Sequence, residues 1–211
     1  LNVILQGKSY REVNLDNKYF YEVMDQSEEI PTSSQPSIDE LLDVFKSIVK
    51  SGDNVVGVFL SSDMSGTYSS AHLAKNMVLE EYPDARIEII DSRTNCMQMG
   101  FQVIEGARAA KEGKSIEEVV EVVNNVVKSS RFLFVPDTLR YLKKGGRIGG
   151  AAALFGTILQ IRPILTVRDG VTSVFEKVRT KKKAVNAIVD KVLDDIKNYG
   201  LGDVIVHHKI G

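Results

Sequence analysis

The sequence predicts an α/β fold: an N-terminal parallel-sheet domain with flanking helices over residues 1–129, and a C-terminal α+β domain with a mostly antiparallel sheet over residues 130–211. In the first part, apolar runs of strand length alternate with amphipathic helical patterns, which is typical of a parallel sheet. In the second part, an Asp-Gly pair separates two apolar runs and predicts a hairpin. A chain of 211 residues, 43% of them hydrophobic, is long enough to bury a core.

The first elements are a short hairpin and a helix. Apolar and polar residues alternate around Gly7-Lys8, and a glycine at the first turn position accepts a positive φ. A polar loop, "TSSQPS", covers residues 32–37. Ser37 and Glu40 have the spacing of a capping box, so we expect a helix to begin there, with its apolar face on one side and its end at Gly52.

Two strands and their helices complete the first domain. The continuous apolar run at 54–61 predicts a strand buried on both faces, and residues 86–91 predict a second strand. A helix begins near Gly66, another covers about 97–111, and Ser115 with Glu118 offers a second capping box. We expect the domain boundary near Ser129.

The second domain begins with a strand at 131–135 and a short helix that ends at Gly145-Gly146. Two strands follow around Asp169-Gly170. A long amphipathic helix then ends at Gly200, and the segment 203–208 predicts a last strand. The expected apolar face of the long helix is formed by Val185, Ile188, Val189, Val192, Leu193 and Ile196.

Composition argues against several classes of function. A formal net charge of −1 gives no electrostatic reason to expect nucleic acid or an acidic membrane as partner. The single cysteine, Cys96, excludes an internal disulfide, suits the cytoplasm and, with three histidines, leaves little for a metal site. No apolar run approaches the roughly 20 residues of an integral membrane segment. Because the chain begins at Leu1 and ends just after an expected strand, we expect both ends to continue in a longer protein.

The turn at Ser65-Gly66 is a candidate anion site. It follows a buried strand and precedes a helix, whose first N–H groups and positive dipole end favour negative charge. The alternative is that Ser65 only caps the helix. A further alternative is an esterase-like enzyme with Ser65 as nucleophile, although "MSGT" lacks the "GxSxG" pattern and a histidine base would have to come from elsewhere in the chain.

Three other features carry candidate chemistry. The hydroxyls of the 32–37 loop lie near the same expected sheet edge, unless they serve only as helix caps. Arg147 stands between two glycine pairs in "KKGGRIGG", and its guanidinium suits a carboxylate or phosphate. Arg179 precedes the long helix and is either a second functional cation or a surface charge. The glycines match no nucleotide-binding pattern.

Taken together, these motifs resemble the DegV family. The resemblance rests on "TSSQPS", "FLSSDMSGTYSSA", "IIDSRTNCMQMG" and "LRYLKKGGRIGG", supported by "PILTVRDGVTSVFEKVRTKKKA", and covers essentially the whole chain. It implies two α/β domains that clamp a fatty acid, with the carboxylate on Ser33 and Ser65. Ser33 stands where the family commonly has threonine, and Ser34 is the adjacent alternative. The family's opening Asp-Ser-Thr/Ser motif and its later histidine have no counterpart here.

The resemblance also implies a function and a partner. The protein would bind a long-chain fatty acid in a tunnel and present its carboxylate to a separate ATP-dependent fatty acid kinase, without cofactor and without enzyme activity of its own. Gly66 and Arg147 would lie at the carboxylate, and Arg179 would concern phosphate transfer or kinase contact. Candidate tunnel-lining residues, which ordinary core packing explains equally well, are Ala151 to Phe155, Ile158 and Leu159.

Overall fold

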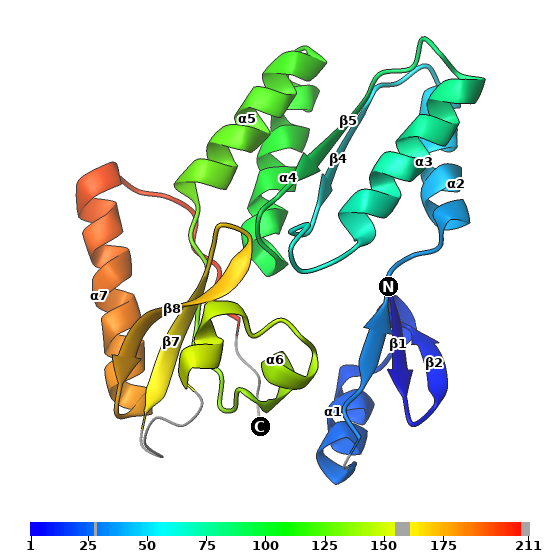
Figure 1. Ribbon diagram of the computed structural model, residues 1–211. Coiled ribbons are helices and arrows are strands. Elements are labelled where there is room, and N and C mark those ends of the chain that lie inside the picture. Colours follow the sequence, from blue (N-terminus) through cyan, green and yellow to red (C-terminus); the bar gives the residue numbers. More distant parts are fainter. Residues whose placement is uncertain (28, 155–160, 208–211) are drawn as a thin grey trace.

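The computed structural model describes residues 1–27, 29–154 and 161–207. These segments form three small sheets with helices packed around them (Figure 1). One sheet is parallel, with strands β4 and β5, and another is antiparallel, with the order β6-β7-β8. This combination confirms the predicted α/β fold class.

The N-terminal segment forms a small antiparallel sheet of its own, with the strand order β2-β1-β3. Its strands are β1 (Asn2–Leu5), β2 (Lys8–Arg11) and β3 (Thr32–Ser34), and α1 (Asn17–Gln26) lies between the last two. The predicted hairpin is present, but Gly7 occupies the second turn position, after Gln6, and not the first. Both residues have positive φ, because the pair Leu5 and Lys8 closes a two-residue turn.

The central part is built on β4 (Val55–Phe59) and β5 (Ile87–Asp91), which pair in parallel. Helices α2 (Ile38–Lys50) and α3 (Thr67–Glu81) lie on one side, and α4 (Cys96–Lys111) and α5 (Ile116–Ser129) lie on the other (Figure 1). In β4 only Val55 is fully buried and the other residues are half-buried. Its apolar run therefore reflects helices on both faces, with less complete cover than the sequence predicted. The buried core here consists of Leu41, Phe45, Val55, Ala71, Ala74, Val78 and Ile87.

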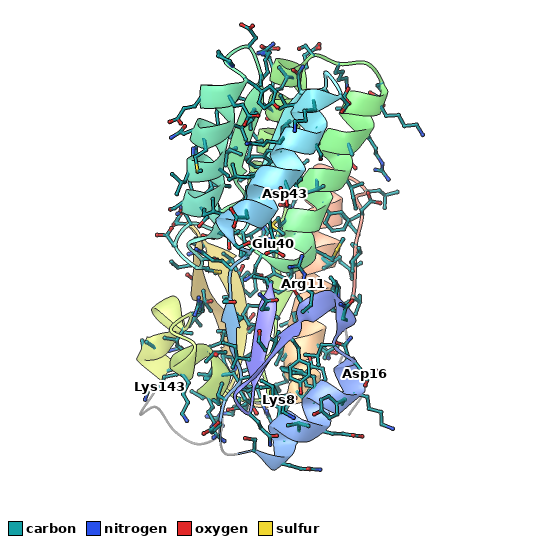
Figure 2. The ribbon with its side chains drawn as sticks, turned by 90° about the vertical axis from the view of Figure 1, so that its right-hand side faces the viewer. Lys8, Arg11, Asp16, Glu40, Asp43 and Lys143 are labelled. Atoms are coloured by element: carbon teal, nitrogen blue, oxygen red, sulfur yellow. The ribbon has the colours of Figure 1, made fainter. Side chains whose placement is uncertain are left out.

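Both predicted capping boxes are confirmed. The Ser37 hydroxyl accepts from the Glu40 N–H at 3.2 Å, and the Glu40 carboxylate accepts from the Ser37 N–H at 3.0 Å. Ser115 and Glu118 repeat the arrangement at the start of α5, with distances of 3.3 and 2.7 Å. Glu40 also forms an ion pair with Arg11, which ties β2 to the start of α2 (Figure 2).

The C-terminal part is mostly antiparallel. It contains β6 (Leu133–Phe134), α6 (Arg140–Lys144), a 3-10 segment (Gly149–Leu154), β7 (Arg162–Arg168), β8 (Val171–Val178) and α7 (Lys181–Tyr199). Asp169 and Gly170, with φ of 51° and 82°, form the predicted hairpin turn between β7 and β8. Strand β7 is the most buried of the described strands, with Ile164 and Leu165 fully covered.

Two predictions for this part need correction. Residues 203–207 form no strand, because this exposed segment pairs with no strand among the described residues; His208 lies outside them. The expected apolar face of α7 is only partly buried: Ile188, Val192 and Ile196 are half-buried, whereas Val185, Val189 and Leu193 remain about half exposed. The boundary at Ser129 stays a prediction, although α5 ends there.

None of the helices that the structure describes is both long and apolar enough to cross a membrane. Within the same residues, no group of three or more His, Cys, Asp or Glu side chains is arranged to hold a metal ion.

The capping boxes give a stability prediction. Ser115→Ala removes the acceptor for the Glu118 N–H and should lower the free energy of unfolding by about 1 kcal/mol, which is roughly 2–4 °C in Tm. The control is Ser69→Ala, because Ser69 is an exposed serine inside α3, where alanine favours the helix. Thermal unfolding followed by circular dichroism measures both. An equal loss for the two variants would contradict the role of the cap.

Candidate ligand-binding site

The carboxyl ends of β4 and β5 meet at one edge, where a polar loop follows each strand. The Ser61 N–H donates to the Thr94 carbonyl at 2.8 Å, and the Ser92 N–H donates to the Phe59 carbonyl at 2.9 Å. Ser61, Ser92 and Thr94 are almost completely buried. The two loops are therefore fixed to each other, and this edge is where open α/β sheets bind ligands.

Ser65 and Thr67 place two hydroxyls at the start of α3. Their oxygens lie 2.9 Å apart, and the Thr67 N–H donates to the Ser65 hydroxyl at 3.2 Å. The N-cap residue of the helix is Gly66, which has no side chain to offer. Ser65 therefore does not occupy the N-cap position. A half-buried hydroxyl pair beside a 15-residue helix start can donate hydrogen bonds to an anion.

Gln35 links the segment after β3 to the start of α3. Its amide donates to the Ser70 hydroxyl at 2.9 Å, and its side-chain oxygen lies 2.9 Å from where a Cβ on Gly66 would be. A side chain at position 66 would therefore collide with Gln35. Ser33 and Ser34 lie just before Gln35 on β3, and both are exposed. Because successive strand residues point to opposite faces, only one of these two serines can face α3.

Arg147 reaches the same loop from the C-terminal part. Its Nε donates to the Met64 carbonyl at 3.0 Å, next to Ser65, and its guanidinium also donates to the Gly145 carbonyl. Gly146 and Gly149 have positive φ, and a Cβ on Gly149 would lie 2.3 Å from the Thr172 carbonyl. The glycines of "KKGGRIGG" thus allow a tight path against β8 that aims Arg147 at the start of α3.

Arg179 lies elsewhere. Arg179 follows the last residue of β8, whereas the Asp169-Gly170 turn precedes the first residue of that strand. It is the turn, at the opposite end of β8, that accepts a hydrogen bond from the Ser61 hydroxyl. Eight strand residues separate the two ends, which corresponds to roughly 25 Å at about 3.3 Å per residue. The exposed Arg179 is therefore remote from the other candidates, along with the lysines that open α7.

The candidate lining residues have divided environments. Ala151 and Leu154 are buried and pack with Leu165, so they belong to the core of the C-terminal part. Ala152 and Ala153 are exposed. Phe155, Ile158 and Leu159 lie outside the described residues.

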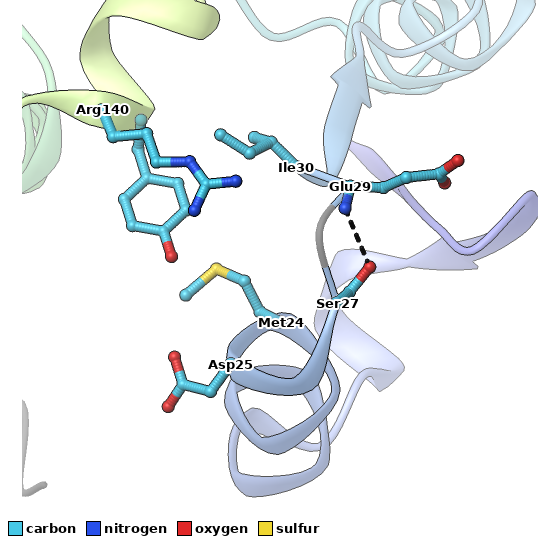
Figure 3. Close-up of a pocket in the computed structure, with 7 residues that line it drawn as sticks. Met24, Asp25, Ser27, Glu29, Ile30 and Arg140 are labelled. Carbon is cyan, nitrogen blue, oxygen red and sulfur yellow. Dashed lines mark hydrogen bonds between the residues drawn. The ribbon is translucent and has the colours of Figure 1, made fainter.

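Two small cavities flank the segment that leads into β3. One, of about 90 Å³, lies between α1 and α6 and is lined by Met24, Ile30 and Tyr141 among others (Figure 3). The other, of about 250 Å³, includes Leu5, Ile30 and Pro31. Both cavities are lined in part by Glu29 and Ile30, which precede the serines of β3, and Ser65 lines neither cavity.

The geometry gives little support to Ser65 as a nucleophile. In the part of the chain that the structure describes, its hydroxyl hydrogen-bonds only with Thr67, and no histidine is within hydrogen-bonding distance. His72, on α3, has its ring against Tyr68. A nucleophilic serine needs an adjacent base, so this geometry argues against the esterase-like alternative.

Sequence reasoning missed Ser61, Asp91 and Arg93, which join this edge to the β7–β8 turn. Burial opposes ionisation of Asp91, but hydrogen bonds from Ser62 and Arg93 outweigh it and hold the pKa of that carboxyl below its ordinary value. The sequence did hold a signal for a polar cluster, because "IIDSRTN" places Asp91 at the end of a strand and Arg93 two residues later.

Comparisons with known proteins agree with this architecture. The family model described as "uncharacterised protein, DegV family" matches residues 1–211. A DegV domain-containing protein of Clostridium acetobutylicum is 56% identical over 208 residues, which cover 99% of this chain and 73% of that protein.

Solved structures give the same result. A stearic acid-binding protein from Eubacterium ventriosum superposes with a TM-score of 0.84 at 31% identity, over 93% of this chain and 68% of that one. The fatty acid kinase (Fak) B3 protein of Streptococcus pneumoniae, loaded with linoleic acid, has a TM-score of 0.80 at 28% identity, over 92% and 68% of the two chains. This chain therefore belongs to the DegV family.

Proposed function

We propose that this protein binds a long-chain fatty acid, with the carboxylate at the start of α3, and presents that carboxylate to a separate ATP-dependent kinase. The observation that carries the proposal is the meeting of three segments at one helix start. Ser65 and Thr67 supply hydroxyls, Arg147 arrives on the adjacent carbonyl, and Gln35 brings the serines of β3 alongside.

The chemistry of this edge suits a carboxylate. An ionised carboxylate that leaves water needs hydrogen bonds to replace its hydration. Hydroxyl donors, free N–H groups at a helix start and one guanidinium supply them. On β3, which ends just before Gln35, Ser33 is the first candidate for a further hydroxyl donor and Ser34 is the alternative.

The acyl chain supplies most of the binding energy. Each methylene removed from water contributes about 0.8 kcal/mol, so even partial burial of a C16 chain between the domains supports tight binding. The two structural neighbours, one a stearic acid-binding protein and the other loaded with linoleic acid, support a long acyl chain as the ligand. The kinase partner is supported by the name of the second neighbour, a fatty acid kinase B3 protein.

The binding site predicts a specific loss in Ser65→Ala. The variant removes one hydroxyl donor to a charged group, which should weaken oleate binding roughly tenfold or more. Titration of delipidated protein by calorimetry measures the affinity. Ser65→Thr, which keeps the hydroxyl, and Ser69→Ala, on an exposed face of α3, should both bind nearly as the unchanged protein does. Unchanged affinity in Ser65→Ala, or an equal loss in Ser69→Ala, would remove Ser65 from the site.

Arg147 should contribute to binding through its charge and its place at Met64. Arg147→Ala should weaken oleate binding about tenfold, whereas Arg168→Ala, at an exposed position of β7, should not. The two variants lose the same charge, so a difference between them reports position. Measured with a neutral ligand such as oleyl alcohol, Arg147→Ala should lose much less. An equal loss for acid and alcohol would contradict contact with the carboxylate.

Arg179 should separate binding from phosphorylation. Its distance from the start of α3 predicts that Arg179→Ala leaves oleate affinity nearly intact. If this basic end of the hairpin faces the kinase, acyl-phosphate formation reconstituted with the kinase and ATP should fall at least about tenfold. Lys197→Ala, near the other end of α7, is the control. Equal loss of binding and phosphorylation would place Arg179 at the acyl site, and no loss of either would make it a surface charge.

A further inference from the structure

The turn between β7 and β8 is held by two residues of the central part. The buried Ser61 hydroxyl donates to the Gly170 carbonyl at 2.7 Å, and the Arg93 guanidinium donates to the Asp169 carbonyl. Two successive backbone carbonyls at the tip of one domain are thus bound by side chains that follow β4 and β5. The tip is fixed through its backbone, and among the residues that the structure describes the Asp169 side chain makes no hydrogen bond or ion pair.

Arg93 is itself held in place by two carboxylates. Its guanidinium lies 2.7 Å from Asp63 and 3.2 Å from Asp91. Asp91 is fixed in turn by the Ser62 hydroxyl, which donates at 2.6 Å, and by the backbone N–H of Arg93, which donates at 2.8 Å. The arginine therefore arrives at the tip already oriented, and little conformational entropy is lost when it binds the turn.

The tip is shaped to accept this contact. Gly170 is buried and has a φ of 82°, and a Cβ there would lie 2.6 Å from the Arg93 guanidinium carbon and 2.7 Å from an Asp63 oxygen. Only glycine permits both the backbone conformation and the close approach. The glycine of the Asp-Gly turn thus serves the junction between the domains as well as the hairpin.

The loop between β4 and α3 has a second attachment, nearer to α3. Arg147 donates to the Met64 carbonyl, so residues 61–64 carry two direct attachments to the C-terminal part: the Ser61 hydroxyl on the Gly170 carbonyl, and the Met64 carbonyl on Arg147. Asp63 is linked to the turn through its ion pair with Arg93, which donates to the Asp169 carbonyl. Ser65 directly follows Met64. The attachment at Arg93 therefore determines where the loop that carries Ser65 sits relative to Arg147.

We propose that Arg93 is a positioning residue of the ligand site. Together with Ser61, Asp63 and Asp91 it forms a hairpin clamp that holds the β7–β8 turn on the loop before α3, and so keeps Ser65 and Arg147 at a fixed separation. This inference rests on the proposed fatty acid site for its functional consequence. A ligand enclosed between the domains leaves when they separate, so the clamp slows dissociation of the acyl chain.

The test uses Arg93→Gln, which loses the charge and the fork of donors. In delipidated protein, hydrogen exchange of the backbone amides of residues 61–66 and 169–172 should speed up at least about tenfold, because the loop opens locally more often. With a fluorescent fatty acid, stopped-flow dissociation should accelerate at least about fivefold, while the amides of α5 keep their protection. Asp63→Asn should produce smaller changes in the same direction, and Arg93→Lys should restore part of the slow dissociation.

Two controls are matched to this variant. Arg168→Gln removes an exposed positive charge next to the turn, and the Arg168 side chain makes no hydrogen bond or ion pair with Ser61, Asp63, Asp91 or Arg93. Asp169→Asn keeps a residue that tolerates positive φ and leaves the accepting carbonyl in place. Both should dissociate ligand at the unchanged rate.

These measurements distinguish failure of the proposed clamp from failure of the proposed fatty acid site. If the unchanged protein binds no fatty acid, the proposed function fails, yet faster exchange at 61–66 in Arg93→Gln would still support the clamp. If the protein binds fatty acid and Arg93→Gln alters neither exchange nor dissociation, the clamp is wrong. Uniformly faster exchange that includes α5, or equal defects in Arg93→Lys and Arg93→Gln, would make Arg93 a general stabilising residue and overturn the positioning role.

Discussion

The structure depends on one edge, where β4 and β5 end side by side. Reciprocal backbone hydrogen bonds join the two loops that leave these strands, from Ser61 to Thr94 and from Ser92 to Phe59. Because both loops are fixed there, they can hold elements that come from distant parts of the sequence. The β7–β8 turn and Arg147 contact the loop after β4, at Ser61 and Met64, and Gln35 contacts Ser70 at the start of α3, the helix that this loop leads into. A parallel pair of strands thus gives a rigid base to a site whose other walls are loops.

From this edge, a chain of hydrogen bonds between buried and half-buried polar groups runs to the end of α5. The Thr94 hydroxyl donates to the Gln98 side chain, whose amide donates to the backbone carbonyl of Ser130 at 3.1 Å. Ser130 follows the end of α5, where the chain leaves the helices of the parallel sheet and enters the antiparallel β6-β7-β8 sheet. Buried polar groups with partners fix a single arrangement, because each lost contact costs the full desolvation of the group left behind. The central and C-terminal parts are therefore held together at Ser130, at the β7–β8 turn and at Arg147. A ligand that enters between them meets a defined geometry.

Elements with strong local signals were predictable from the sequence, and long-range contacts were not. Ser37 with Glu40, Ser115 with Glu118, and the Asp169-Gly170 turn appear as expected, because capping boxes and two-residue turns are determined by neighbours in sequence. The prediction of a strand at 203–208 was wrong for the described residues 203–207, because a strand needs a partner strand and the sequence pattern does not show whether one is available. Arg147 was singled out from its glycines, but its contact with Met64 spans 83 residues and depends on how the domains meet. Arg93 was not predicted as a site residue, because its contact with the hairpin turn depends on the tertiary structure.

We propose that the start of α3 binds the carboxylate of a fatty acid, and a crystal structure of the protein with oleic acid would show this contact. In that structure we expect one carboxylate oxygen within hydrogen-bonding distance of the Ser65 or Thr67 hydroxyl, the Arg147 guanidinium beside it, and the acyl chain between the central and C-terminal parts. A carboxylate bound beside Arg179, or an acyl chain on the outer surface with no group at Ser65, would contradict it.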